Sequence, residues 1–147
     1  MIEVLCAPTM NGGRLHCPIR ADEEGSGLYG ASRGKRKHTG IDLAAPAGSV
    51  LLSPVCGYVT KLGYPYGDDL SFRYVQVSTL PDGGDDYRFF YVKPRKGLEV
   101  GEQIERGDRL GRVQTLQNRY PGIIDHVHFE VINADGEYVD PTPRLFC

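Results

Sequence analysis

The sequence predicts an all-β protein, with an antiparallel β-sheet core, short hairpins and long loops. Three observations lead to this prediction. The 19 glycines and 10 prolines are spread along the whole chain, and no helical periodicity of apolar residues lasts for more than a turn or two. Short runs of β-branched and aromatic residues instead alternate with turn signals, which is the pattern of an all-β fold.

The expected strands begin at Ser49 and share this composition of β-branched and aromatic residues between Gly, Pro or Asp turns. They are residues 49–53, 57–62, 72–78, 87–92, 110–113, 126–132 and 137–139. The turn at residues 81–84, Pro-Asp-Gly-Gly, predicts that the strands on either side of it form a hairpin.

The length of 147 residues suits one domain with one hydrophobic core. We expect a single zinc-binding, metallopeptidase-like domain over residues 1–147. Residues 1–37 form its least regular part, because they contain few strand-like runs and end in a Gly- and Arg-rich stretch.

The charge balance gives no support to nucleic-acid binding, because the net charge is −2 and the most basic run, residues 33–37, is short. No apolar stretch is long enough to span a membrane. The first six residues lack the basic start and apolar core of a signal peptide. We therefore expect that the protein stays in its cell, has lost a signal by trimming, or is exported by another route.

The four cysteines, Cys6, Cys17, Cys56 and Cys147, include no Cys-x-x-Cys pair, so a zinc ribbon is not expected. Two disulfides in any of three pairings remain open, as do free thiols. A bridge between Cys6 and Cys17, which flank a Gly-Gly loop, is as plausible as burial of unpaired thiols.

Two of the four histidines, His126 and His128, lie two residues apart in the last long expected strand. Side chains two apart on a strand point to the same face, so both imidazoles and Glu130 should project opposite the apolar Val127 and Phe129. Such a pair suits a metal site, or one ligand beside a proton-transfer base. Glu130 could orient one imidazole, or could simply be a buried carboxylate.

His38 and Asp42 form the second cluster, in a segment where the glycines and prolines make a helix unlikely to form. A loop that runs into a strand can also bring them together. His38, Asp42 and one of His126 or His128 would supply three ligands and leave one position for water, the usual catalytic zinc arrangement. Zn²⁺ is the expected ion, although such sites accept other divalent metals. His16 is expected to be an ordinary surface or core residue.

Five segments, in order, resemble the lysostaphin-type (LytM-like) zinc metalloendopeptidases. They are residues 29–33, 38–48, 100–111, 126–131 and 139–141, so the resemblance extends over roughly residues 29–143. It implies that His38, Asp42 and His128 bind zinc and that His126 is a catalytic histidine. It also implies cleavage of peptide bonds, commonly in peptidoglycan cross-links, by a metal-activated water.

One position departs from that family, because Lys93 stands where a further catalytic histidine is expected after Tyr91. The segments 90–94 and 116–128 resemble the leukocyte cell-derived chemotaxins, secreted signalling proteins that keep the zinc on the same scaffold. Cys6 and Cys17 fall near two of the chemotaxin cysteines. We interpret the chain as a branch between the two groups.

Together these features predict a slow or specialised zinc peptidase that acts on peptidoglycan or another peptide substrate, in which Lys93 could stabilise an oxyanion. Such a protein would be secreted or would act in the cell envelope. The alternative is a zinc-binding module with little or no activity, which binds a peptide, a glycan or a receptor or other protein partner. A third possibility is a purely structural zinc. The sequence specifies no oligomeric state.

Overall fold

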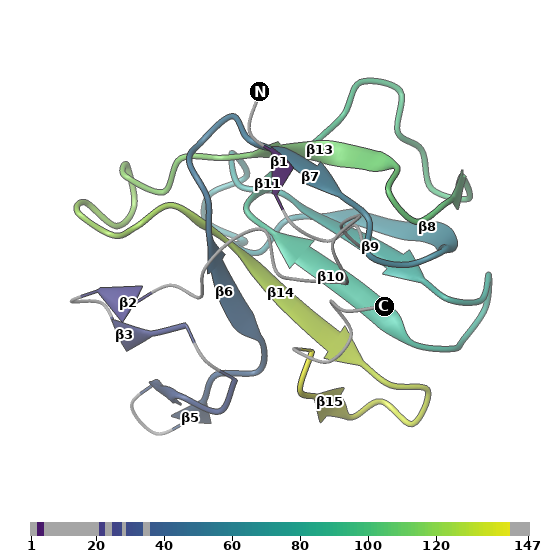
Figure 1. The fold of residues 1–147 in the computed structure, drawn as a ribbon, viewed down its shortest axis with the longest axis horizontal. Helices are drawn as coiled ribbons and strands as arrows, with labels where there is room; N and C mark the ends of the chain where they lie inside the picture. Colours follow the sequence, from purple (N-terminus) through teal and green to yellow (C-terminus); the bar gives the residue numbers. More distant parts are fainter. Residues whose placement is uncertain (1–2, 5–20, 23–24, 28, 34–35, 142–147) are drawn as a thin grey trace.

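The computed structural model describes residues 3–4, 21–22, 25–27, 29–33 and 36–141 and confirms the all-β prediction. The described residues form fifteen strands and no helix (Figure 1). Accordingly, this part of the chain has no helix that is long and apolar enough to cross a membrane.

The larger sheet has seven antiparallel strands in the order β12-β8-β9-β10-β14-β15, and β6 pairs with β14. These strands are β6 (Ile41–Ala44), β8 (Gly57–Gly63), β9 (Tyr74–Ser78), β10 (Asp86–Phe90), β12 (Gln103–Ile104), β14 (His126–Ile132) and β15 (Tyr138–Val139). The predicted hairpin is confirmed, because β9 and β10 pair antiparallel across the turn at residues 81–84.

The smaller sheet has four strands in the order β1-β7-β13-β11. They are β1 (Glu3–Val4), β7 (Val50–Leu52), β13 (Arg109–Val113) and β11 (Val92–Pro94), and only β1 and β7 pair parallel. Two separate pairs join β2 (Ala21–Asp22) to β3 (Gly25–Ser26) and β4 (Ser32–Arg33) to β5 (Arg36–Lys37). The described residues before His38 thus form only two-residue strands.

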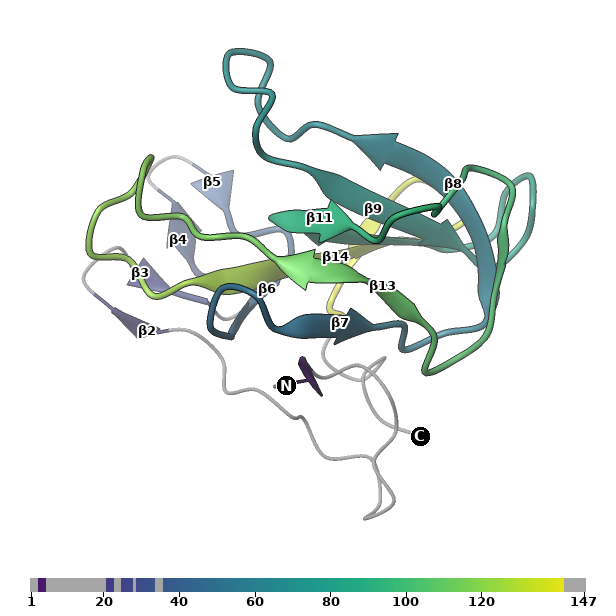
Figure 2. The same cartoon turned by 90° about the horizontal axis from the view of Figure 1, so that it is seen from above.

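The hydrophobic core lies where the smaller sheet covers one face of the larger sheet (Figures 1 and 2). Leu51, Leu110 and Val113 enter the core from the smaller sheet. From the larger sheet come alternate residues such as Phe89 and Phe129, whose parallel rings stack with centroids 4.9 Å apart. Since one face of the larger sheet is used for the core, its other face is available for polar side chains.

The expected strand at residues 87–92 is wrong in one respect, because it is divided at Tyr91 into β10 and β11. Tyr91 adopts φ 69°, which a non-glycine residue rarely takes. Phe89 and Val92 would point to opposite faces of one regular strand, yet both are fully buried in the core. The turn at Tyr91 makes this possible by carrying the chain from the larger sheet to the smaller one.

Three of the four cysteines, Cys6, Cys17 and Cys147, lie outside the described residues, so a Cys6–Cys17 bridge stays a prediction. Cys56 is an exposed free thiol.

Gly40 allows β6 to approach β14 closely. A Cβ atom at this position would lie 2.2 Å from the carbonyl oxygen of Phe129, well inside van der Waals contact. The obstacle is backbone of β14, which also pairs with β10 and cannot move aside without disturbing the sheet. The absence of a side chain at Gly40 is therefore required for the β6–β14 pairing.

We predict that Gly40→Ala lowers the free energy of unfolding by about 1–3 kcal/mol, the usual cost of an overpacked interior. Gly67→Ala is the matched control, because a Cβ there meets nothing within 4 Å. Urea denaturation of both variants measures the difference. Equal stability of the two variants would contradict the close approach of β6 and β14.

Candidate metal centre

The pairing of β6 with β14 places Asp42 directly opposite His128. Strand alternation sends Val127, Phe129 and Val131 into the core, and His126, His128 and Glu130 to the other face of the sheet. The side chains of the site thus occupy the face that does not pack on the smaller sheet.

His38 reaches the same place from the segment just before β6. Its backbone is fixed by two hydrogen bonds, from His38 N to Ala31 O at 2.7 Å and from Gly30 N to His38 O at 2.9 Å. His38 and Asp42 therefore come together through a loop that enters a strand and not through a helix.

The side chains of His38, Asp42 and His128 converge on one point. Asp42 Oδ1 lies 3.1 Å from His38 Nε2 and 3.0 Å from His128 Nδ1, and these two nitrogens are 2.9 Å apart. His38 and Asp42 are buried, and His128 is partly buried. Two imidazole nitrogens and a carboxylate oxygen this close together form a group that can hold a metal ion.

The electrostatics of the group favour a positive charge at its centre. Burial raises the pKa of Asp42, but hydrogen bonds with His128 and His38 lower it more. The pKa therefore lies well below its usual range, and the carboxylate is ionised. Burial lowers the pKa of His128, but its hydrogen bonds with Asp42 and Glu130 raise it to about 9. Two carboxylates thus stabilise a cation here, whether it is a proton or a metal ion.

Glu130 fixes the orientation of His128. The Glu130 carboxylate oxygen Oε1 lies 2.8 Å from His128 Nε2, which leaves Nδ1 turned towards Asp42. Thr39 donates to the same oxygen at 3.2 Å, and Arg88 contacts Oε2 at 3.4 Å. A carboxylate on the far nitrogen of a histidine is the arrangement that orients metal-binding imidazoles.

Arg88 extends this contact into a row of polar side chains across the larger sheet. Its Nε donates to Gln76 Oε1 at 2.8 Å, and Gln76 Nε2 donates to Thr60 Oγ1 at 3.0 Å. These residues lie on β8, β9 and β10, so three strands support the position of Glu130.

His126 lies beside the group and has a defined tautomer. Its Nδ1 lies 2.7 Å from the Ile124 carbonyl oxygen, which can only accept, so Nδ1 carries the hydrogen. In the neutral ring Nε2 then carries a lone pair, and it lies 3.7 Å from Asp42 Oδ2. His126 is therefore placed to accept a proton next to the three candidate ligands.

A tyrosine cluster, which sequence reasoning missed, borders His126. The ring of Tyr91 meets the His126 ring edge-on at 5.5 Å, and Tyr66 Oη lies 2.9 Å from Tyr91 Oη and 2.7 Å from Tyr120 Oη. The guanidinium of Arg119 covers the Tyr66 ring at 3.7 Å. Burial raises the pKa of Tyr91 to about 12, and burial together with the hydrogen bonds raises that of Tyr66, so both hydroxyls stay protonated well above neutral pH. No local pattern indicates this cluster, because Tyr66, Tyr91 and Tyr120 lie in three separate segments of the sequence.

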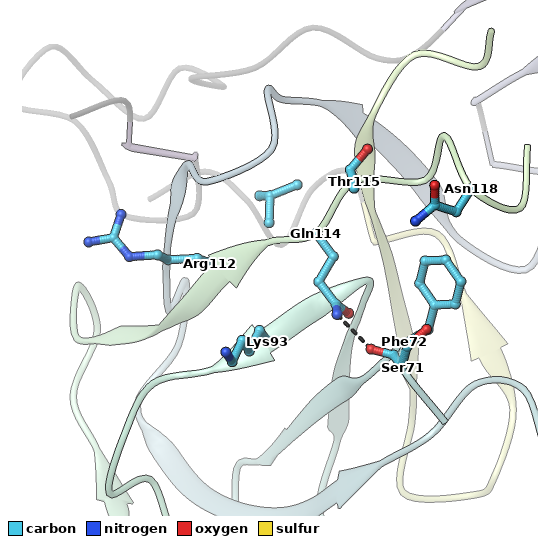
Figure 3. A pocket seen from close by; sticks show the side chains of 8 residues that line it. Ser71, Phe72, Lys93, Arg112, Gln114, Thr115 and Asn118 are labelled. Carbon is cyan, nitrogen blue, oxygen red and sulfur yellow. Dashed lines mark hydrogen bonds between the residues drawn. The ribbon is translucent and has the colours of Figure 1, made fainter. Parts of the chain in front are cut away.

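Lys93 is exposed on β11, opposite Arg112 on β13. In this segment of the chain, the ring of Tyr91 contacts His126. Lys93 instead lines a pocket together with Arg112 and Gln114 (Figure 3). His16 lies outside the described residues.

Comparison with known proteins agrees with this arrangement. The model of peptidase family M23 matches residues 36–141, which include all the residues of the site. Leukocyte cell-derived chemotaxin-2 of Mus musculus is 35% identical over 124 residues, which cover 84% of this chain and 76% of the chemotaxin.

Solved structures share the fold. Csd3 of Helicobacter pylori superposes with a TM-score of 0.64 at 19% identity, over 98% of this chain and 34% of that one, so this chain spans about a third of that protein. LytU superposes with a TM-score of 0.63 at 24% identity, over 86% of this chain and 83% of LytU. The family match over most of the chain, the chemotaxin likeness and the shared fold lead to one conclusion: the chain belongs to peptidase family M23.

Proposed function

We propose that this chain is a zinc metalloendopeptidase domain of slow or specialised activity, which hydrolyses peptide bonds in peptidoglycan cross-links. The observation that carries the proposal is the convergence of His38 Nε2, Asp42 Oδ1 and His128 Nδ1, with His126 beside them. This donor set fits zinc, which favours nitrogen and oxygen ligands, and three protein ligands leave a position for water.

The proposed ligands are His38, Asp42 and His128, and the proposed catalytic residue is His126. When bound, zinc supplies Lewis-acid activation of a water molecule and of the scissile carbonyl group. His126 accepts a proton at Nε2, because its Nδ1 hydrogen is held by the Ile124 carbonyl oxygen. Glu130 keeps Nδ1 of His128 directed at the metal position.

The tyrosine cluster restricts the motion of His126. Tyr91 presses edge-on against the imidazole, and its hydroxyl is held by Tyr66, which Arg119 covers. A fixed imidazole loses less freedom when it engages a substrate. Since peptidoglycan lies outside the cell membrane, the proposed substrate also implies that the protein acts in the cell envelope or is secreted.

A second function has specific support. The family resemblance implies a further histidine at the position of Lys93, and the chain is 35% identical to chemotaxin-2. On this alternative the domain binds zinc but cleaves weakly or not at all, and the site grips a peptide, a glycan or a receptor. Ligand binding would then survive His126→Ala.

We predict that zinc-loaded protein produces new amino termini from peptidoglycan and from glycine-rich peptides. His126→Ala should lower the rate by about 100- to 10,000-fold, the usual contribution of a general acid–base group. The variant should keep its zinc, because His126 is not a proposed ligand. Mass spectrometry of the products and metal analysis of the protein give the two readouts.

Chelated wild-type protein is the control for this assay, and added zinc should restore its activity. Cleavage that persists after chelation or in His126→Ala would contradict the proposed mechanism. A folded, zinc-bound protein that cleaves none of these substrates would contradict the peptidase and favour the binding module.

We predict that Glu130→Gln weakens zinc binding by about 10- to 100-fold, the usual effect of removing the carboxylate behind a histidine ligand. Glu137→Gln is the matched control, because Glu137 is exposed at the turn before β15. Competition with a chromogenic chelator measures both affinities. Equal affinities for the two variants would show that Glu130 does not orient His128 for the metal.

A further inference from the structure

A pocket of about 320 Å³ opens between β11, β13 and the segment before β9 (Figure 3). Its lining combines two cations, four neutral polar side chains and two apolar ones. These are Lys93 and Arg112, then Ser71, Gln114, Thr115 and Asn118, and finally Phe72 and Val113. The volume lies at the lower end of the range for ligand pockets, so it suits one residue or one small group.

The two cations are placed where strand pairing makes them repel. Lys93 and Arg112 are direct partners in the antiparallel pair of β11 and β13. Like charges directly opposite each other on neighbouring strands destabilise the pair. Such a placement is relieved when an anion lies between or above the two groups.

No carboxylate of the described residues neutralises either cation. The lining contains no acidic residue, and neither Lys93 nor Arg112 forms an ion pair within the part of the chain that the structure describes. Arg112 Nη1 donates to the Gly48 carbonyl oxygen at 2.9 Å, which leaves its other donors for a ligand. The nearby Asp69 accepts from the Ser71 hydroxyl and does not line the pocket.

Gln114 makes the wall between the cations and the apolar end of the pocket rigid. Its Oε1 accepts from Arg73 N at 2.9 Å, and its Nε2 donates to the Ser71 carbonyl oxygen at 2.7 Å, as Figure 3 shows for Ser71. One side chain, directly after β13, therefore ties this end of β13 to the segment before β9. The pocket is a built feature of the fold, because both of its walls are joined through this amide.

Phe72 connects the pocket to the tyrosine cluster that borders His126. The Phe72 ring, which is buried, lines the pocket and also meets the rings of Tyr66 at 5.6 Å and Tyr91 at 6.0 Å. Tyr91 in turn contacts His126. Phe72, Tyr66 and Tyr91 pack together in one apolar cluster, so the pocket and the tyrosine cluster share a packed wall.

We propose that this pocket binds the carboxylate of a peptide. Lys93 and Arg112 hold the carboxylate, and Phe72 and Val113 form an apolar floor beneath the peptide residue that bears it. Arginine and lysine form charge-assisted hydrogen bonds with carboxylates. Only the choice of a peptide as ligand rests on the proposed function. A sulfated glycan fits less well, because only two cations face a pocket of this size.

The test is an NMR titration of the isotope-labelled chain with an N-acetylated tetrapeptide of glycine ending in alanine, as its free acid and as its carboxyl-terminal amide. We expect the acid to bind about tenfold more tightly than the amide, which corresponds to about 1.4 kcal/mol. The backbone amides of Lys93, Arg112 and Gln114 should shift. Raised salt should reduce the preference for the acid.

Two matched pairs of variants locate the effect. Lys93→Gln and Arg112→Gln should each remove most of the preference for the acid. Lys96→Gln and Arg109→Gln should keep it, because both residues are exposed neighbours outside the pocket. Equal binding of acid and amide, or an equal loss in the control variants, would overturn the proposal.

A second titration uses a heparin oligosaccharide in place of the peptide. If it shifts the same amides and binds more tightly than the peptide acid, through Lys93 and Arg112, the assignment to a peptide is overturned. The titration uses the labelled chain with the His126→Ala substitution, which is expected to slow cleavage by about 100- to 10,000-fold, and mass spectrometry verifies that the peptide stays intact. A domain that cleaves nothing but prefers the acid supports the pocket and contradicts only the peptidase.

Discussion

The register between β6 and β14 is the constraint on which the candidate site depends. It sets Asp42 against His128 and brings His38, four residues earlier, to the same point. A shift by one residue would turn His126, His128 and Glu130 into the core and Val127 and Phe129 outwards. The hydrophobic core thus fixes the register, and the register assembles the group of ligands. Gly40 contributes by allowing the two backbones to meet without a side chain between them.

Polar side chains on one face of the larger sheet then specify how the site is oriented. The contacts from Thr60 through Gln76 and Arg88 to Glu130 form a row that ends on His128. Each buried polar group in this row has a partner, which is the condition under which such networks are stable. Tyr91 has a related role on the other side, because the turn that carries the chain between the two sheets also presses its ring against His126.

Much of the fold could be predicted from the sequence, because local patterns determine it. Those patterns also point to His38, Asp42 and one of His126 or His128 as candidate ligands, and the choice of His128 comes from the resemblance. Alternation along residues 126–132 predicts one polar face and one apolar face, and the structure has both. The break of the expected strand at Tyr91 could not be predicted, since it depends on the competition of two sheets for Phe89 and Val92. The tyrosine cluster and the row behind Glu130 were also beyond local patterns, because their members come from separate strands and loops. The sequence alone marks Lys93 as an unusual residue, but its pairing with Arg112 follows only from the strand register.

The most direct test of the central claim is a crystal structure of zinc-loaded protein with diffraction data collected at the zinc absorption edge. The account predicts one anomalous peak held by His38 Nε2, Asp42 Oδ1 and His128 Nδ1, at about 2.0–2.2 Å from each. Glu130 should remain on His128 Nε2. A peak bound by other residues, or a zinc-saturated crystal with no peak between these three side chains, would contradict it.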